Sequence, residues 1–470
     1  MNHATKAGIA LLAASLTAFA NAQDGTDVHS DDHLAPVDQP LIEDLDDLIT
    51  DQELSSGLFQ DHRLTLHVRN FASREQMKGA KFSIQKSDGT TQATRSRNTW
   101  VQSHQVRYQS GYTSGTVGFG FDLGAANVVN LERGKGRIAG GGNRTLTHSN
   151  GEALDQWSKL HSAALRLKVS ETQLQVGRHQ PETPVFNILD NRALPPTFTG
   201  LSLISDDIEN LNLQAGSFQR SNPRTTAGER KLGLTYGSPS RPGGALHYLG
   251  GTYGRDDGGT LSLYTSRFEN VWNQYYLGAA QELGQREELW FRASFNGYHT
   301  RDTGSRKAGY IDISAYSLGL SLGHQAHTLG VAGQKIQGDT YQDFVAETAA
   351  IYLSNDDNVA PSEKSLGLTY QTDWGYMDMP GLTSTLWRIR GWGMNGTRYR
   401  GDRHDAFAGY DVRGIAGMSR VEHGLSVRYR IASGTLKDSS IATIFYVNKE
   451  HRGTQVKELR LVSNFPINLL

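Results

Sequence analysis

The feature that most constrains this chain is a strand-like alternation of apolar and polar residues that continues from about Asp61 to Leu470. In GLSVRYRIAS (residues 424–433), the leucine, valine and tyrosine share one face of an extended strand and the two arginines share the other, because successive side chains point to opposite sides. HRLTLHVRNF, ALRLKV and ELRLVSNF repeat this pattern. The repetition, interrupted by glycine-bearing polar segments and free of sustained helical periodicity, predicts one large all-β unit.

Whole-chain properties exclude a bundle of membrane helices and fit a β-barrel in lipid, although they separate such a barrel from a soluble β-protein only weakly. The mean hydropathy of −0.50 and the lack of a long apolar run after the first residues exclude a helical membrane protein. A membrane-spanning strand of ~9–11 residues is apolar only at alternate positions, so a barrel has no such run. At about 23 residues per strand and connection, residues 61–470 predict an all-β, antiparallel transmembrane β-barrel of about 18 strands.

The N-terminal 60 residues do not follow the alternation. Residues 1–22 combine an early lysine, an apolar run and a small-residue cleavage site, which predicts a signal peptide and export. Residues 23–60 form an acidic lead-in that has eleven acids, and neither lysine nor arginine, between Asp24 and Glu53. This composition predicts a mobile segment, with a short amphipathic helix in LIEDLDDLITDQEL as the alternative. The predicted organisation is therefore signal peptide (1–22), lead-in (23–60) and barrel (61–470).

Three long irregular segments interrupt the strands and are candidates for functional loops, the first being the glycine-rich ERGKGRIAGGGNRTLTHSNGEALDQW (residues 132–157). QPETPVFNILDNRALPPTFTG (residues 180–200) contains four of the twelve prolines of the chain, so it cannot be a central strand. QGDTYQDFVAETAAIYLSNDDNVAPSEKS (residues 337–365) has no regular alternation either. Long loops without secondary structure in a compact unit are usually functional or disordered.

Several long motifs resemble the OprD-type porins, the outer-membrane carboxylate channel family. They are YQSGYTSGTVGFGFDLG, NRALPPTFTGLSLISDDIENLNLQAGSF, WNQYYLG and the C-terminal GLSVRYR…ELRLVSNFPINLL, and they occur in the family's order. The resemblance implies an outer-membrane location and a monomeric or weakly trimeric 18-stranded barrel, narrowed by inward-folded constriction loops. It also implies passive uptake of small carboxylate-bearing nutrients, with amino acids among the candidates.

The same resemblance implies a row of basic side chains on one wall of the pore. Matched position by position, this pore-lining basic ladder consists of Arg74, Arg97, Arg390, Arg428, Arg430 and Arg460. Arg192 in DNRALPP matches an arginine of the constriction loop, and Tyr236 in GLTYG matches a pore-lining tyrosine. Guanidinium groups remain charged and bind carboxylates through paired hydrogen bonds, so such a row would pass an anion from one group to the next.

Other functions have weaker support in the sequence. GLSLG (residues 319–323) matches the spelling of a hydrolase nucleophile elbow, but it lies in an alternating run rather than between a strand and a helix. An outer-membrane barrel enzyme, such as a lipase or protease, and a non-selective or structural barrel are the alternatives. The sequence predicts no enzyme activity, no cofactor and no metal site. The net charge of −1 gives no attraction for nucleic acid, so the expected partners are small solutes and membrane lipids.

Overall fold

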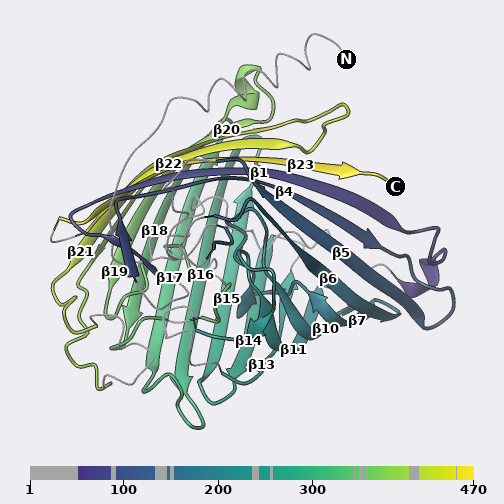
Figure 1. The fold of residues 1–470 in the computed structure, drawn as a ribbon, viewed down its shortest axis with the longest axis horizontal. Coiled ribbons are helices and arrows are strands. Elements are labelled where there is room, and N and C mark those ends of the chain that lie inside the picture. The colour runs from purple at the N-terminus through teal and green to yellow at the C-terminus, as the bar shows by residue number, and fades with distance from the viewer. Residues whose placement is uncertain are drawn as a thin grey trace.

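The computed structural model describes residues 51–85, 91–132, 145–148, 153–234, 243–254, 258–342, 344–348, 353–355, 358–401, 412–450 and 453–470. The predicted signal peptide, most of the predicted lead-in and Tyr236 lie outside these residues. Within them, the chain forms a closed antiparallel β-barrel (Figure 1). This confirms the predicted fold class.

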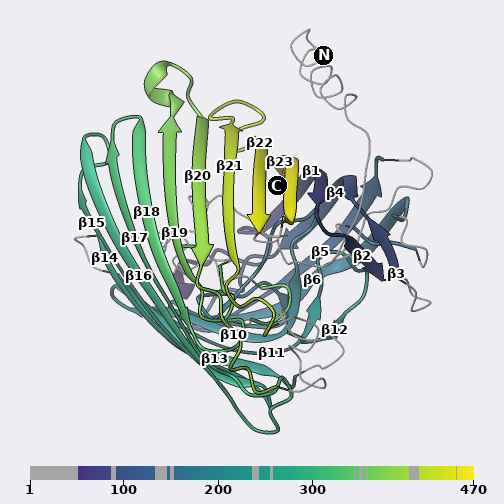
Figure 2. The ribbon, with the colours of Figure 1, turned by 90° about the vertical axis from the view of Figure 1, so that its left-hand side faces the viewer.

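Eighteen strands of the described chain form the barrel wall, each paired with the next. They are β1 (Arg63–Lys78), β4 (Ser96–Gln109), β5 (Gly118–Asn130), β6 (Gln156–Val169), β7 (Thr172–His179), β10 (Thr197–Ile208), β11 (Leu211–Asn222), β13 (Leu246–Gly254), β14 (Gly259–Phe268), β15 (Trp272–Gly284), β16 (Leu289–Asp302), β17 (Asp312–His324), β18 (His327–Gln337), β19 (Lys364–Asp373), β20 (Leu382–Trp392), β21 (Ser419–Arg430), β22 (Ser440–Glu450) and β23 (Gln455–Asn468). Pairing of β1 with β23, from Thr65 opposite Asn468 to Lys78 opposite Gln455, closes the wall (Figure 2). Closure removes the free edges that an open sheet would expose to lipid.

Five shorter strands lie outside this ring. They are β2 (Phe82–Gln85), β3 (Thr91–Thr94), β8 (Glu182–Thr183), β9 (Phe186–Asn187) and β12 (Arg230–Lys231). The pairs β2–β3 and β8–β9 form separate hairpins, and β12 pairs with the end of β11. These strands therefore belong to the connections rather than to the wall.

The alternation in the sequence separates the two faces of the wall. On β21, Leu425, Val427 and Tyr429 point outward and are exposed, whereas Glu422 and Ser426 point inward and are buried. Exposed leucines recur on the outward faces of the neighbouring strands β19 and β20. A continuous outward surface of this kind would be costly in water but is suited to lipid.

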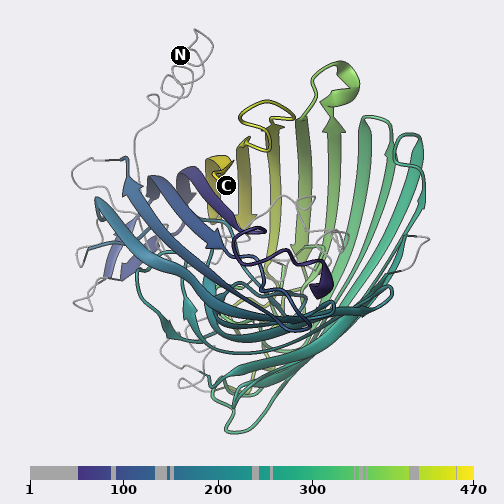
Figure 3. The same ribbon diagram turned by 90° about the vertical axis from the view of Figure 1, so that its right-hand side faces the viewer.

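The connections differ at the two ends of the barrel. At one end, turns of two residues join β6 to β7, β10 to β11 and β17 to β18. At the other end, long connections join β7 to β10, β18 to β19 and β20 to β21. In outer-membrane barrels the short turns are periplasmic and the long loops are external, which orients the chain. Figure 3 shows the wall from the side opposite to Figure 2.

The only helices in the described chain are two short 3₁₀ turns, η2 (Gln52–Leu54) and η3 (Trp374–Met377), and none is long and apolar enough to cross a membrane. Residues 51–60, the end of the predicted lead-in, pack against the periplasmic end. The buried Gln52 donates from Nε2 to the carbonyl oxygens of Thr113 (2.8 Å) and Gly115 (3.1 Å). Its backbone N–H also donates to the carbonyl of Ser170 (3.0 Å). The chain is therefore anchored at the periplasmic mouth before its first strand begins.

Candidate functional site

The third external loop (residues 180–196) joins β7 to β10 by crossing the interior of the barrel. Its first part reaches β16, where the hydroxyl of Tyr298 donates to the carbonyl of Pro184 (2.7 Å). Its second part reaches β4, where the hydroxyl of Ser103 donates to the carbonyl of Ala193 (2.6 Å). A loop that contacts opposite walls must narrow the lumen. This confirms the inward-folded constriction loop that the sequence predicts.

The seventh external loop (residues 338–363) meets the third loop inside the barrel. An isolated bridge pairs Ile188 with Thr348, and the N–H of Leu189 donates to the carbonyl of Glu347 (3.0 Å). A second bridge joins Val345 to Leu234 of the fourth loop. Backbone hydrogen bonds of this kind fix the loops to one another as well as to the wall.

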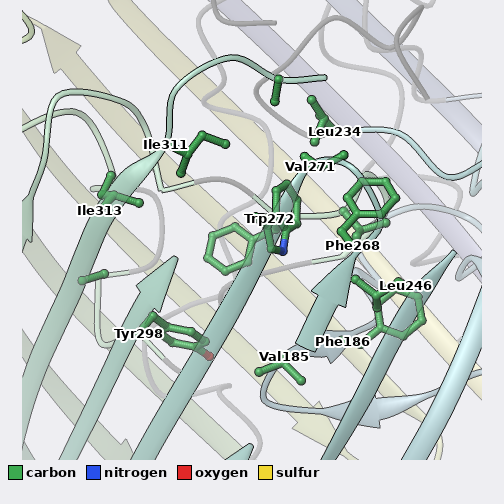
Figure 4. Packing of buried hydrophobic residues seen from close by; sticks show 14 of the residues in the cluster. Val185, Phe186, Leu234, Leu246, Phe268, Val271, Trp272, Tyr298, Ile311 and Ile313 are labelled. Carbon is green, nitrogen blue, oxygen red and sulfur yellow. The ribbon is translucent and has the colours of Figure 1, made fainter. Parts of the chain in front are cut away.

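An apolar cluster holds these loops against one side of the barrel. Figure 4 shows Val185 and Phe186 of the third loop and Leu234 of the fourth loop with strand residues such as Leu246 and Tyr298. The aromatic rings of Phe186 and Phe198 lie 4.6 Å apart, a spacing typical of favourable ring packing. Since this cluster fills the side lined by β10–β18, the polar part of the lumen lies toward β1 and β4–β6.

An ion pair connects the third loop to the polar side of the wall. Arg69 of β1 donates from Nη1 and Nη2 to the two carboxylate oxygens of Asp190 (2.5 and 2.7 Å). Its Nη1 also donates to the carbonyl of Arg192 (2.8 Å). Burial alone would raise the pKa of Asp190, but the Arg69 guanidinium outweighs it and holds that pKa below its usual value. Asp190 is therefore ionised and neutralised by its partner at neutral pH.

A second carboxylate, Glu347 of the seventh loop, is held by two arginines. Arg224 donates from Nε to Oε2 (2.7 Å) and Arg230 donates from Nη2 to Oε1 (2.9 Å). Arg224 also donates to the side-chain oxygen of Asn191 in the third loop. Burial would raise the pKa of Glu347, but the two arginines lower it. Asp190 and Glu347 are thus both held by protein cations.

The wall facing these loops is basic because of an unusual strand at its centre. The inward positions of β5 include Gly118, Gly120 and Gly124, which leave space above the strand. A Cβ on Gly120 would lie 2.9 Å from the carbonyl oxygen of Gly111 and 3.3 Å from Nη2 of Arg166. A larger side chain at Gly120 would displace Arg166, whereas Gly118 and Gly124 are packed against Gln52 and Ser162.

Four basic side chains from β4 and β6 surround this glycine-lined strand, and we call them the basic track: Lys159, Arg107, Arg166 and Lys168. Register places Arg107 opposite Gly124, which is itself opposite Ser162 of β6. The track therefore descends from Lys159 on the external side to Lys168 on the periplasmic side.

The members of the basic track differ in accessibility. Arg166 lies 3.1 Å from Asp122 and stacks 4.5 Å from the ring of Tyr112, and its side chain is only 4% exposed. Lys159 donates to the carbonyl of Pro223 (2.7 Å) and is also buried. Arg107 is different, because its side chain is 49% exposed and its nearest approach to Asp122 is 3.8 Å. Arg107 is the member that a solute in the lumen can contact directly.

Comparison with known proteins identifies this architecture. Residues 56–469 match the model of the family described as outer membrane porin, OprD family. The chain belongs to the OprD family of outer membrane porins. It is 30% identical to Porin D of Pseudomonas aeruginosa over 441 residues, covering 90% of this chain and 95% of that protein. It is 27% identical to the porin-like protein GalP of Pseudomonas putida, covering 74% of this chain and 83% of that protein.

Solved structures agree with this assignment. The crystal structure of Pseudomonas aeruginosa OccD3 (OpdP) matches with a TM-score of 0.78 and 42% identity, covering 90% of this chain and 95% of that one. The structure of Pseudomonas aeruginosa OprD matches with a TM-score of 0.73 and 27% identity, covering 90% and 99%. The protein is therefore a porin of the Gram-negative outer membrane.

Two of the arginines predicted for the ladder face the interior of this porin but are fully engaged. Arg97 donates from Nε and Nη2 to the two oxygens of Glu75 (both 2.7 Å). Arg460 donates to Glu458 from Nε and Nη2 (both 3.0 Å), and Glu458 also accepts from Ser73 (2.6 Å). Both arginines are buried, so they tie β23, β1 and β4 together.

Two other predicted ladder residues lie near the periplasmic end of β21. Arg428 is on the inward face, opposite Thr383 and the buried Ala442. Arg430, the last residue of the strand, is exposed and donates to Asp438 in the following turn (2.7 Å). Arg192, predicted for the constriction loop, is buried in the third loop beside the Arg69–Asp190 pair.

The structure places Arg74 and Arg390 on the outward face, where they cannot line the pore of this porin. Arg390 follows the exposed Leu386 by four residues and lies opposite Leu366, which is exposed on β19. Arg74 lies opposite Leu459, on the face of β1 opposite to Glu75. Their assignment to the pore came from motif position, and the strand parity in the structure shows that it is wrong.

Sequence reasoning missed the basic track, although its signal was present. ALRLKV was recognised as a strand with Arg166 and Lys168 on its polar face, but those residues were not assigned to the pore. Alternating glycines in the adjacent GFGFDLG are the missing clue. A strand that lacks side chains on its inward face leaves space for long basic side chains from its neighbours.

The hydrolase-like GLSLG motif has a structural role in the porin. Gly319–Gly323 lies within β17, and no strand-to-helix turn is present there in the described chain. Its inward residues Gly319 and Ser321 line a cavity of about 370 Å³ against β16, β18 and β19. Small residues at these positions widen the periplasmic half of the barrel beside the loops.

Proposed function

We propose that this porin conducts small solutes that carry a carboxylate, and that the basic track is the path along which the carboxylate moves. The observation that carries the proposal is the half-exposed Arg107. It lies above the glycines of β5, with Lys159 on its external side and Arg166 and Lys168 on its periplasmic side. Its ion pair with Asp122 is long (3.8 Å), and Arg166 lies closer to that carboxylate (3.1 Å).

The chemistry follows from the spacing and burial of the basic groups. A carboxylate that reaches Arg107 exchanges water for charge-assisted hydrogen bonds, which are worth roughly 1.5–3 kcal/mol each before desolvation. The buried Lys159, Arg166 and Lys168 contribute a positive field in a confined lumen. With Arg107 as the single accessible contact in this positive field, a carboxylate binds weakly enough to be released, as permeation requires.

The constriction loops support the same selectivity from the opposite side. Asp190 and Glu347 would repel a carboxylate if they were free, but Arg69, Arg224 and Arg230 neutralise them. Neutralisation of these two carboxylates leaves the half-exposed Arg107 as a positive contact for the solute. Of the ladder predicted from the sequence, Arg428 faces inward near the periplasmic mouth and Arg430 is neutralised by Asp438. Arg97, Arg460 and Arg192 hold the wall and loop in place. Tyr236 remains a proposed pore-lining residue.

Liposome swelling with matched solutes tests the proposal. Arg107→Gln should slow uptake of a small carboxylate by about tenfold, the equivalent of one lost charge-assisted contact, and leave uptake of its neutral amide nearly unchanged. Arg306→Gln is the control, since Arg306 is an exposed arginine of the external loop after β16 that pairs with Asp302. Equal slowing of both solutes in the Arg107 variant would show that this arginine shapes the pore without selecting charge, as in the alternative of a non-selective barrel.

A further inference from the structure

The outward face of β18–β23 carries a group of basic residues just inside the external rim. Lys335 of β18 lies opposite Lys364 of β19, and Lys364 lies opposite Trp392 at the end of β20. Arg388 and Arg390 lie on the same face of β20, and Lys449 occupies the corresponding end of β22. All five basic side chains are exposed. We call them, together with Trp392, the outer basic patch.

No carboxylate shares this face among the described residues of β18–β23. The four acids of these strands, Asp373, Glu422, Glu450 and Glu458, all have inward parity. Directly opposed like charges destabilise a sheet, so the Lys335–Lys364 pair has an energetic cost unless an anion lies between the two ammonium groups. The outer basic patch thus lacks its counter-charge within the described protein.

The position of the patch indicates where that counter-charge comes from. Exposed leucines, including Leu366, Leu368 and Leu386, continue the same strand faces toward the membrane centre. The ring of Trp392 lies beside Arg390, 6.0 Å from its guanidinium carbon, and tryptophan is typical of the membrane interface. The basic groups therefore lie at the level of lipid headgroups, above a surface suited to acyl chains.

We propose that the outer basic patch binds a phosphate-bearing glycolipid of the outer leaflet. Its phosphates would lie between Lys335, Lys364 and the two arginines of β20, with its acyl chains against the leucines below. Arginine and lysine both bind phosphate, and arginine does so in a bidentate manner. A second copy of this chain is disfavoured as the occupant, because a two-fold contact through this face would oppose one positive patch with another.

Native mass spectrometry of the purified, detergent-folded porin tests this proposal with lipid A as the probe. Wild-type protein should retain phosphorylated lipid A and bind the dephosphorylated form about tenfold or more weakly. Arg388→Gln/Arg390→Gln should weaken binding of the phosphorylated form by a similar factor and leave binding of the dephosphorylated form unchanged. Because the wild type is tested with both forms of lipid A, the proposal can be judged even if the double variant folds poorly.

The matched control removes two outward arginines from the same end of a neighbouring part of the wall. Arg267→Gln/Arg301→Gln changes residues of β14 and β16, where Arg301 lies opposite the outward Asp312. This variant should bind phosphorylated lipid A as the wild type does. Three results would overturn the proposal: equal binding of both lipid forms by the wild type, equal loss in the two double variants, or a change of oligomeric state in Arg388→Gln/Arg390→Gln.

Discussion

The two faces of the barrel wall both carry arginine, yet they accommodate the charge in opposite ways. On the inward face, Arg97, Arg460 and Arg420 are paired with Glu75, Glu458 and Glu363, and all three carboxylates are buried. On the outward face of β18–β23, the basic groups have no carboxylate beside them in the described chain. The same residue type is thus paired with a buried carboxylate on the inward face and has no carboxylate beside it on this part of the outward face.

The difference follows from what surrounds each face. A buried guanidinium without a partner is strongly unfavourable, so the wall supplies a carboxylate for Arg97 and Arg460, and the seventh loop supplies one for Arg420. At the headgroup level outside, lipid and water can supply the counter-charge, and long side chains can extend toward the interface. An arginine count from the sequence therefore cannot give a pore charge, because strand parity decides which medium each arginine meets.

The largest loss of stability is expected when a carboxylate that pairs with an inward arginine is removed. Glu458→Ala leaves Arg460 buried without its partner and removes the acceptor for the hydroxyls of Ser73 and Tyr446. We expect a loss of about 3–5 kcal/mol in the free energy of unfolding, measured by urea titration of the refolded barrel. Asp438→Ala is the control, since its pair with Arg430 is exposed and should be worth no more than about 1 kcal/mol. Similar losses in the two variants would contradict the distinction between buried ties and surface pairs.

A smaller loss is expected when a charge is introduced on the outward face. Leu425→Arg places a guanidinium among Leu386 and Phe445, far from either strand end, at a cost of about 2–4 kcal/mol. Tyr429→Arg makes the same change one residue before the end of β21, where the cost falls to about 0–1 kcal/mol. The yield of folded protein in lipid, read from gel mobility without heating, distinguishes the two. Equal yields would mean that depth in the membrane does not control the outward face.

These contrasts also show what the sequence could and could not predict. Strand period, glycine-bearing breaks and terminal motifs were enough for an 18-stranded barrel, because alternation is a local property of each strand. The constriction by residues 180–196 was predictable from its prolines and its resemblance to the family. Motif resemblance does not report strand parity at individual positions, so Arg74 and Arg390 were assigned to the pore.

The basic track was missed for a different reason. Its members come from β4 and β6, and β5 between them contributes Gly120, which leaves room for Arg166, and Asp122, which both Arg107 and Arg166 approach. Likewise, the partners of Glu347 are Arg224 and Arg230 of another loop, more than a hundred residues away in sequence. Contacts of this kind depend on register and loop path, which no local pattern contains.

A pH titration tests whether Asp190 and Glu347 are neutralised by their arginine partners. We expect a smaller effect than for the substitutions above. The pKa values of Asp190 and Glu347 are lowered, so their ion pairs are intact above the ordinary carboxyl range and are lost only as the pH falls through the lowered values. Single-channel conductance should therefore be steady from neutral pH to about pH 5 and change below about pH 4. Asp190→Asn should already show part of the acid change at neutral pH. A wild-type transition centred near pH 6 that Asp190→Asn abolishes would contradict this assignment.

The smallest effect is expected for a single outward arginine in the absence of phosphorylated lipid. Arg390→Gln removes a charge that has no carboxylate partner among the described residues and lies at the level of the membrane interface, so stability in a neutral detergent should change by no more than about 0.5 kcal/mol. Arg460→Gln, the inward counterpart, leaves the Glu458 carboxylate without its guanidinium and should cost several times more.

Adding phosphorylated lipid A should separate the wild type from Arg390→Gln, because a ligand that binds only the folded state stabilises the protein that binds it better. The gap in unfolding free energy between these two proteins should therefore widen with lipid concentration, while Arg267→Gln should follow the wild type throughout. If Arg390→Gln were already as destabilised as Arg460→Gln in neutral detergent, the outward guanidinium would be a structural tie like the inward one, and the contrast between the two faces would fail.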